Sequence, residues 1–292
     1  MVDVSIVVPV YNGADTLKTC LQSLQTQTLP RERYEIIVVD DGSSDASAQI
    51  ALDAGVQLIR QPNGGAPAAR NTGIAAARGT WVAFTDSDCV ASRGWLAALL
   101  QAAQSVPGAL GAAGKTIGLK SQTPAARFVD LMGGLDAIRS LQHPRFPFAP
   151  TANVLYSREA LEKAGGFDRR YATYDACDLH TRLRRAHPGA FPYEARALIM
   201  HKHRTDWRAY RKQQFYYGVG YAQFVLAHRR ELPWTIAREL RSLWEVACKA
   251  WRALLPAGGD ERILRQGQFV RVAAQHAGFV RTFYNPRERR RW

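Results

Sequence analysis

The sequence predicts an α/β protein with a mixed, mainly parallel sheet flanked by helices and followed by a C-terminal helical region. Dense β-branched runs such as Val4–Val10 and Tyr34–Val39 suit strands that are buried on both faces. These runs alternate with helix-length segments through short connections, which is typical of parallel strands joined by crossover helices. An amphipathic, basic stretch near the C-terminus predicts the appended helices.

The expected elements follow one another in the order that this fold requires. The expected strands lie at 4–10, 34–39, 56–59, 81–84, 111–119, 151–156 and 197–200. The expected helices begin near Asp15 or Thr16, Ala46, Ala68, Ser92, Ser157 and Tyr174. Residues 120–146 lack a clear periodicity, so a mobile acceptor loop and ordinary irregular structure both remain open there.

Two carboxylates follow the apolar strand Trp81–Phe84 directly. Asp86 and Asp88 stand one residue apart at its C-terminal end, where open α/β sheets bind ligands. Through the turn they can converge on one hard cation, and Mg²⁺ or Mn²⁺ prefers such oxygen ligands. The alternative is a polar turn whose acids are solvated or cap a helix.

Net charge is concentrated in the C-terminal part of the chain. The whole chain has 39 Lys+Arg and 25 Asp+Glu, giving +14, and from His201 onward the counts are 19 and 7, giving +12. The first 200 residues therefore have 20 and 18, giving +2. A nearly neutral body with a strongly basic C-terminal part indicates an acidic surface as partner.

Several protein classes are disfavoured by what the sequence lacks. Its four cysteines are far apart, which argues against a zinc site and a disulfide framework. There is no signal-peptide pattern and no 18-residue apolar window, so we expect a cytoplasmic protein. The phosphate-binding patterns GxGxxG and GxxxxGK[ST] are absent, which disfavours a dinucleotide dehydrogenase and a P-loop NTPase.

Four segments within the first 90 residues together resemble the family 2 glycosyltransferases, inverting enzymes with the GT-A fold. They are Val4–Asn12 (VSIVVPVYN), Val38–Asp45 (VVDDGSSD), Ala69–Gly79 (ARNTGIAAARG) and Phe84–Asp88 (FTDSD), the last containing a DXD motif. A looser likeness continues through 165–168, 175–179 and 201–204. The resemblance implies a GT-A domain over 1–205, with a nucleotide-binding half at 1–90 and an acceptor half at 91–205. A basic helical region then covers 206–292.

The resemblance also implies an activity. It is the metal-dependent, hexosyltransferase-type transfer of a sugar from a nucleotide-sugar, with a UDP-sugar favoured. The cofactor would be Mn²⁺ or Mg²⁺. The acceptor would be a hydroxyl group of a saccharide or lipid-linked molecule, in surface polysaccharide or glycolipid synthesis.

The residues of the donor site follow from the same likeness. Tyr11 offers a flat ring and Asn12 paired donors and acceptors, which suit a nucleobase; Tyr11 packed on the core is the alternative. Asp40 is placed against the base or ribose, and Asp41 either contacts the ligand or accepts amide hydrogen bonds within its own turn. Arg70 can clamp phosphates, unless it is a solvated surface residue. The nucleotide-sugar set is Pro9, Tyr11, Asn12, Asp40, Asp41, Arg70, Asn71, Asp86 and Ser87.

A metal site and a general base complete the implied active centre. Asp86, Asp88 and His201 are the expected metal ligands, with His203 as the alternative imidazole. Either histidine can instead be a polar residue at a strand end.

Asp175 is the expected base for the acceptor hydroxyl. Relatives usually show two adjacent acids at this place, whereas Ala176 follows Asp175 here, so a plain helix N-cap is the alternative. Asp178 and Arg182 are four residues apart and are expected to pair on the same helix.

The C-terminal region has an amphipathic stripe. A basic helix with tryptophan on its apolar face suits the surface of an anionic bilayer. The alternatives are that this helix packs on its own domain or on a second subunit in a homodimer. The expected location is therefore cytoplasmic, with a peripheral position on the cytoplasmic face of the membrane as an option. The stripe comprises Ile236, Leu240, Leu243, Trp244, Ala247, Trp251, Leu254 and Leu255.

Two competing functions are weaker. One is a basic membrane- or nucleic-acid-binding protein with a non-catalytic nucleotide-binding domain, but no RNA- or DNA-binding motif accompanies the charge, so no nucleic-acid partner is expected. The other is nucleotidyl transfer, for which the expected Gly-rich, Lys-containing loop after the first strand is absent.

Overall fold

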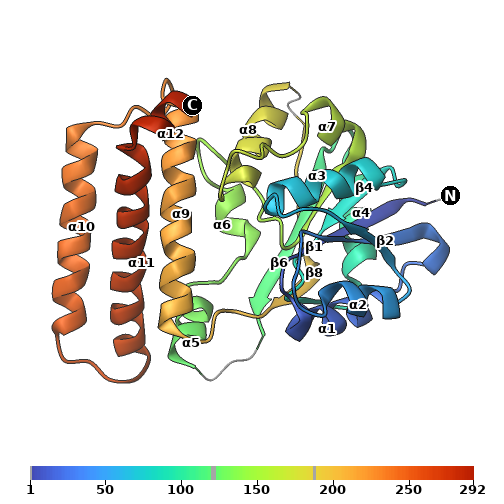
Figure 1. The fold of residues 1–292 in the computed structure, drawn as a ribbon, viewed down its shortest axis with the longest axis horizontal. Coiled ribbons are helices and arrows are strands. Elements are labelled where there is room, and N and C mark those ends of the chain that lie inside the picture. The colour runs from blue at the N-terminus through green and yellow to red at the C-terminus, as the bar shows by residue number, and fades with distance from the viewer. Residues whose placement is uncertain (1, 120–122, 187–188) are drawn as a thin grey trace. The chain divides into compact units, whose positions relative to one another are not determined.

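The computed structural model describes residues 2–119, 123–186 and 189–292 (Figure 1). These residues form two compact units. The first takes its described residues from Met1–Leu119, Leu135–Arg169 and Ala176–Lys202, and the second from Lys120–Gly134, Arg170–Asp175 and His203–Trp292.

A single eight-stranded sheet, in the order β3-β2-β1-β4-β7-β6-β8-β5, forms the centre of the first unit. The β1–β2, β2–β3, β1–β4 and β6–β8 pairs are parallel, and the other three pairs are antiparallel. The mixed, mainly parallel sheet is thus confirmed. The strands are β1 Val4–Val10, β2 Tyr34–Asp40, β3 Gln57–Arg60, β4 Trp81–Phe84, β5 Cys89–Ala91, β6 Gly111–Gly118, β7 Val154–Ser157 and β8 Tyr193–His201.

Helices cover both faces of this sheet (Figure 1). Successive β1 side chains point to opposite faces, so Ile6 packs with Leu17 and Trp95 on one face, and Val7 packs with Ile74 and Leu161 on the other. This double burial explains why the strands have apolar runs instead of alternating sequences. The helices are α1 Ala14–Gln25, α2 Ser47–Asp53, α3 Ala66–Ala76, α4 Trp95–Gln104, α6 Ala137–Leu141, α7 Arg158–Lys163 and α8 Asp175–Ala186, with the short 3₁₀ helix η1 Arg31–Arg33.

The structure differs from the sequence expectation in two places. The short strand β5 (Cys89–Ala91) was not expected, because three residues are too few to show a periodicity. The segment 120–146 contains helices α5 (Pro124–Leu131) and α6 where either a mobile acceptor loop or irregular structure was expected, while residues 120–122 lie outside the described residues. The Thr123 side chain accepts a hydrogen bond from the Ala126 amide and Pro124 occupies the first turn, so local capping starts α5.

A buried carboxylate links three segments of the first unit. Glu35 accepts hydrogen bonds from Ser5 Oγ at 2.6 Å and from the amide and Nε of Arg78 at 2.8 and 2.7 Å. Burial alone raises the pKa of Glu35, but the hydrogen bonds from Ser5 and Arg78 outweigh it, so the pKa is lowered from its usual value.

Replacing Glu35 with alanine is therefore expected to destabilise the protein by about 3 kcal/mol near neutral pH, because charge-assisted hydrogen bonds are lost and Ser5 loses its acceptor. Because the pKa of Glu35 is lower in the folded state, its ionised carboxylate stabilises the fold at pH values above the unfolded-state pKa. This stabilisation is lost as the pH falls through the folded-state pKa. The difference in unfolding free energy between wild type and variant, measured by urea unfolding, should therefore become smaller in acid. Glu32→Ala, at an exposed acid on η1, is the control; an equal effect of both substitutions would contradict the role of Glu35.

The second unit is built from helices. Close contact of α9 and α11 depends on glycine, because a Cβ on Gly218 would lie 1.9 Å from the Gln275 carbonyl oxygen, and one on Gly278 would lie 2.0 Å from that of Phe215. In Figure 1, α11 lies between α9 and α10. No helix within the described residues combines the length and apolar character needed to cross a membrane. The remaining helices are α9 Trp207–Ala227, α10 Ile236–Leu254, α11 Gly259–Phe283 and α12 Pro286–Arg291.

Candidate active site

The two acids of the DXD motif lie in the tight turn between β4 and β5. The Thr85 amide donates to the Val7 carbonyl at 3.4 Å, which extends the strand pairing by one residue. The Cys89 amide then donates to the Asp86 carbonyl at 3.1 Å and closes the turn. Asp86 and Asp88 are both half-buried at this edge of the sheet.

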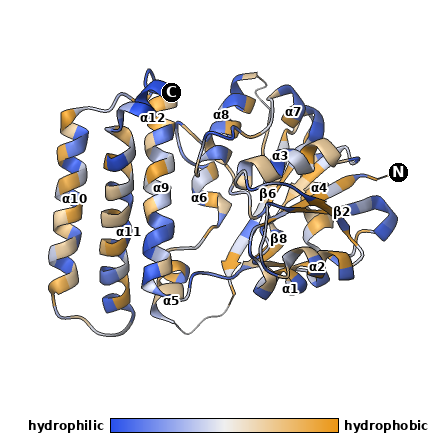
Figure 2. Ribbon diagram, in the orientation of Figure 1, coloured by the Kyte–Doolittle hydropathy of each residue, from blue (hydrophilic) through white to orange (hydrophobic). Residues whose placement is uncertain are grey.

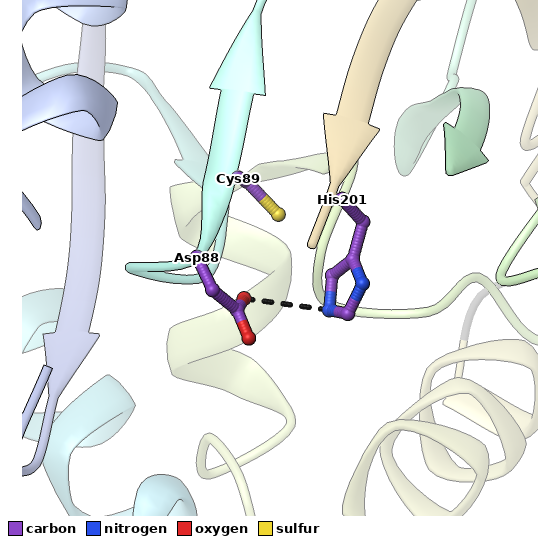
Figure 3. Close-up of side chains that lie close together, drawn as sticks. All are labelled: Asp88, Cys89 and His201. Atoms are coloured by element: carbon purple, nitrogen blue, oxygen red, sulfur yellow. Dashed lines mark ion pairs between the residues drawn. The ribbon is translucent and has the colours of Figure 1, made fainter. Parts of the chain in front are cut away.

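Strand β5 brings a histidine to the second of these acids. It pairs antiparallel with β8 so that Cys89 stands opposite His201, and the Lys202 amide donates to the Asp88 carbonyl at 2.9 Å. As a result, His201 Nε2 lies 3.3 Å from Asp88 Oδ1 (Figure 3). His201 is buried, whereas part of Asp88 reaches solvent.

These residues fit a divalent cation. One ligand atom from each of Asp88, Cys89 and His201 can be chosen so that all lie within 4.8 Å of one another. Burial, followed by the nearby Asp86 and Asp88 carboxylates, raises the pKa of the Cys89 thiol well above its usual value. Sulfur is also a soft ligand, which hard cations such as Mg²⁺ and Mn²⁺ do not favour. A carboxylate oxygen and an imidazole nitrogen remain, and this donor set suits Mn²⁺ or Mg²⁺.

Arg70 on α3 supplies a positive charge beside the acids. Its Nη2 lies 3.4 Å from Asp86 Oδ1, and its guanidinium carbon lies 5.6 Å from the ring centroid of Phe167. Only 6% of Arg70 is exposed, so it is not a solvated surface residue. Its position was expected; the aromatic ring of Phe167 beneath it was not, because the two residues are far apart in the sequence.

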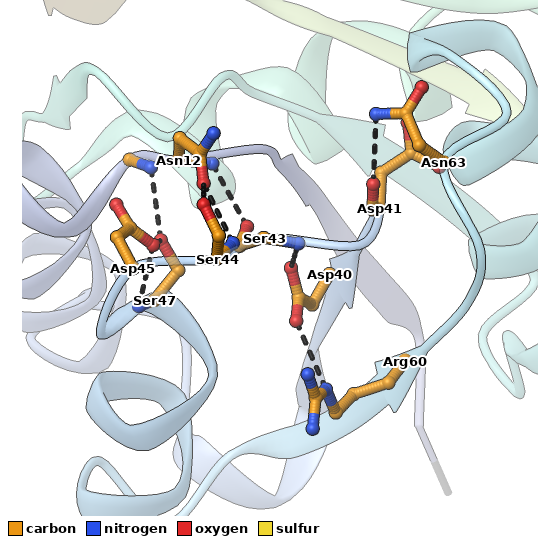
Figure 4. Close-up of polar contacts among 10 residues, drawn as sticks. Asn12, Asp40, Asp41, Ser43, Ser44, Asp45, Ser47, Arg60 and Asn63 are labelled. Carbon is orange, nitrogen blue, oxygen red and sulfur yellow. Dashed lines mark hydrogen bonds and ion pairs between the residues drawn. The ribbon is translucent and has the colours of Figure 1, made fainter.

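The loops after β1 and β2 are tied together at the same edge of the sheet (Figure 4). Asn12 has a positive φ of 50°, its amide donates to Ser43 Oγ at 2.9 Å, and its Oδ1 accepts from the Ser44 amide at 2.9 Å. Its side-chain carbonyl therefore holds a loop in place. Tyr11 is 57% exposed, so its ring is not packed in the core.

Asp40 is fully buried at the end of β2. Its Oδ1 accepts from the Ser43 amide at 2.9 Å, and its Oδ2 pairs with Arg60 Nε at 3.2 Å. Sequence reasoning missed Arg60, although the two residues are direct partners in the β2–β3 register and each ends its strand. That alignment of strand ends is the signal that can identify Arg60.

Asp41 fixes the loop before α3. Its carboxylate accepts from the amides of Gly64 and Gly65 at 2.9 and 2.8 Å and from Gln61 Nε2 at 2.7 Å. These protein partners come from the loop that follows the neighbouring strand β3, and not from Asp41's own turn. Gly65 has a φ of 85°, a conformation that glycine adopts without strain.

Asn71 is also engaged by the protein. Its Nδ2 donates to the Phe167 carbonyl at 2.7 Å, and its Oδ1 accepts from the Phe167 amide at 2.8 Å. Both ends of the side chain thereby hold the Phe167 loop against α3. Pro9 is half-buried within β1, and Ser87 is half-buried between the two acids.

The expected base begins helix α8. Asp175 is buried, and the preceding Tyr174 has a φ of 69°. A non-glycine residue rarely adopts this conformation, and such strain occurs preferentially at functional sites. The Tyr174 ring packs beside Tyr221 and Phe224, which hold it in place.

The predicted pairing of Asp178 with Arg182 on α8 is confirmed. Arg182 Nε donates to Asp178 Oδ2 at 2.8 Å, and its Nη2 donates to the Gly166 carbonyl at 2.8 Å. Asp178 therefore orients an arginine that anchors the Gly165–Gly166 turn.

The alternative imidazole has a different partner. His203 Nε2 lies 3.3 Å from Asp130 Oδ1 on α5. Both residues belong to the second unit, whereas Asp88 and His201 belong to the first.

Comparison with known proteins identifies the family. The profile described as "Glycosyl transferase family 2" matches residues 5–165, which is more than half of the chain. The chain belongs to glycosyl transferase family 2. This assignment agrees with the sheet topology and with the acids at the β4–β5 turn.

Two relatives from the family show how far the likeness extends. The pre-mycofactocin glycosyltransferase of Mycobacterium tuberculosis is 33% identical over 235 residues, covering 77% of this chain and 48% of the relative. Glycosyltransferase AglE of Haloferax volcanii is 40% identical over 99 residues, covering 32% of this chain and 33% of the relative. The chain thus spans half or less of the length of these relatives.

Solved structures share this fold over nearly the whole chain. The mannosyltransferase PcManGT from Pyrobaculum calidifontis, in complex with GDP-Man and Mn²⁺, has a TM-score of 0.69 at 18% identity, covering 97% of this chain and 87% of that one. TarS 1–349 from S. aureus, in complex with UDP-GlcNAc, has a TM-score of 0.56 at 17% identity, covering 95% and 90%. The expected GT-A-type fold is thereby confirmed.

Proposed function

We propose that this family 2 protein transfers a sugar, with inversion, from a nucleoside-diphosphate sugar to a hydroxyl group of a saccharide or lipid-linked acceptor. The observation that carries the proposal is the Asp88–His201 pair at 3.3 Å, beside the buried Arg70 and the DXD motif. These residues come from separate elements and converge at the strand ends where α/β sheets bind nucleotides. The complexes of PcManGT with GDP-Man and of TarS with UDP-GlcNAc support this donor class.

In this proposal Asp86, Asp88 and His201 would hold Mn²⁺ or Mg²⁺. A cation there acts as a Lewis acid that stabilises charge on the departing diphosphate. Arg70 adds a second, fixed positive charge beside Asp86. Because Arg70 is buried, its charge acts more strongly than it would in water.

The donor half, residues 1–90, binds the nucleotide in this proposal. The exposed ring of Tyr11 stacks on the base. Asp40, which is buried and binds the Ser43 amide and Arg60, fixes the turn that lies beside the base edge or ribose. Asn12, Asp41 and Asn71 act mainly by fixing the loops around the nucleotide, because their polar atoms already bind the protein backbone. A uridine nucleotide is the favoured donor.

Asp175 acts as the base in the acceptor half. Its carboxylate takes the proton from the acceptor hydroxyl group while the acceptor oxygen bonds to the anomeric carbon of the sugar. The bond between that carbon and the diphosphate oxygen breaks on the opposite face. One displacement of this kind inverts the anomeric configuration.

The test is a ligand screen on the purified protein. UDP or GDP with Mn²⁺ should raise the melting temperature by on the order of 5 °C, because a ligand at a hundred times its dissociation constant stabilises by about 2.7 kcal/mol. Mn²⁺ alone is the control. A parallel assay follows the hydrolysis of nucleotide-sugars with Mn²⁺ and Mg²⁺. If no nucleoside diphosphate changes the melting temperature and no nucleotide-sugar is consumed, the proposal is wrong.

A further inference from the structure

Helix α10 is held by the second unit along one side. Ser242 Oγ lies 2.9 Å from His276 Nδ1, and Lys249 Nζ donates to Gln268 Oε1 at 2.9 Å; both partners lie on α11. The Thr235 side chain caps the start of the helix. These contacts orient α10 on α11 and leave another side of the helix open.

The open side is apolar along the whole helix. Its members recur at intervals of three and four residues, so they share one face. We name them the open face of α10: Ile236 (81% exposed), Leu240 (61%), Leu243 (47%), Trp244 (71%), Trp251 (67%) and Leu254 (80%). Figure 2 shows hydrophobic residues recurring along α10. Single exposed apolar residues are ordinary, but a contiguous patch on one helix marks a binding surface.

The charges beside this face indicate what binds it. Arg241 and Arg252 are exposed and lie eleven residues apart, which is close to three full turns, so they stand on the same side of α10. The chain from His201 onward has a net charge of +12. A surface that complements this charge is anionic.

Tryptophan and arginine together favour a lipid surface over a protein one. Trp244 and Trp251 lie within the open face, and tryptophan suits the boundary between headgroups and acyl chains. The long side chains of Arg241 and Arg252 can reach lipid phosphates from its rim. A second copy of the chain would instead bring two strongly basic surfaces together, which their like charge opposes.

We propose that the open face of α10 binds an anionic lipid bilayer, with Trp244 and Trp251 inserted at the headgroup level and Arg241 and Arg252 on lipid phosphates. The helix lies in the plane of the interface, since no helix within the described residues has the character of a membrane span. This binding goes beyond the proposed sugar transfer and does not depend on it.

The experiment is co-sedimentation of the full chain with two kinds of vesicle. One contains equal parts of phosphatidylglycerol and phosphatidylcholine, and the other contains phosphatidylcholine alone. The wild type should bind the first, more weakly at high salt, and not the second. The double variant Trp244→Ser, Trp251→Ser should partition into the anionic vesicles about tenfold less than the wild type, or weaker still. The double variant Arg241→Gln, Arg252→Gln should also partition into them about tenfold less.

The control is Leu52→Ser, which removes a comparably exposed apolar side chain (57%) from α2 and should leave partitioning unchanged. Circular dichroism and melting temperature should be the same in all variants, because the replaced side chains are exposed. Equal vesicle binding by the wild type and the tryptophan variant would overturn the proposal. The proposal would also be wrong if the wild type were a dimer that binds no vesicles and the tryptophan variant were a monomer. A second copy of the chain would then cover the open face of α10.

Discussion

Replacing Asp88 with alanine should abolish the contribution of Mn²⁺ to nucleotide binding. The carboxylate lies 3.3 Å from His201 Nε2 and is one of the proposed ligands of the cation. Lewis-acid stabilisation contributes several kcal/mol, so kcat for sugar transfer should fall by on the order of a thousandfold. Melting curves of wild type and variant with UDP or GDP, with and without Mn²⁺, measure the binding part directly.

An exposed acid provides the matched control for this variant. Asp53→Ala on α2 removes a carboxylate that accepts a hydrogen bond from Gln49, away from the strand ends. Its nucleotide- and Mn²⁺-dependent stabilisation should equal that of the wild type. If Asp88→Ala keeps the full effect of Mn²⁺, the cation is not held at this turn.

Replacing Asp175 with asparagine should lower kcat while leaving the donor bound. Asparagine preserves the size of the buried side chain but cannot take a proton from the acceptor hydroxyl. A general base contributes between about a hundredfold and ten-thousandfold, so we expect a fall in kcat on the order of a thousandfold. The stabilisation by nucleoside diphosphate and Mn²⁺ should stay at the wild-type level, because the proposed role concerns the acceptor.

Asp178→Asn distinguishes this role from a purely structural one. Asp178 is similarly buried and lies three residues further along α8, but its carboxylate orients Arg182. Its substitution should lower the melting temperature and leave kcat within a few-fold of the wild type. If Asp175→Asn instead behaves like Asp178→Asn, with a lower melting temperature and near-normal kcat, Asp175 is a helix-capping residue and the base lies elsewhere.

Much of the arrangement of the proposed donor site could be predicted because its residues end predicted strands. Parallel strands bring their C-terminal ends to one edge, so Asp40, Asp86 and Asp88 were expected there. The roles of Asp41 and Asn71 could not be predicted. Their hydrogen-bond partners, the Gly64 and Gly65 amides and the Phe167 backbone, belong to loops whose positions depend on the folded sheet.

The sequence by itself determined the alternating α/β order, the acids at the strand ends, the likeness to family 2 and the amphipathic stripe of α10. These features follow from local periodicity and from motifs read within a few residues. Only the tertiary structure placed His201 beside Asp88, through the pairing of β5 with β8. It also left the open face of α10 exposed while the other side of the helix contacts α11. Local patterns do not encode such long-range contacts, because register and exposure depend on which distant segments pack together.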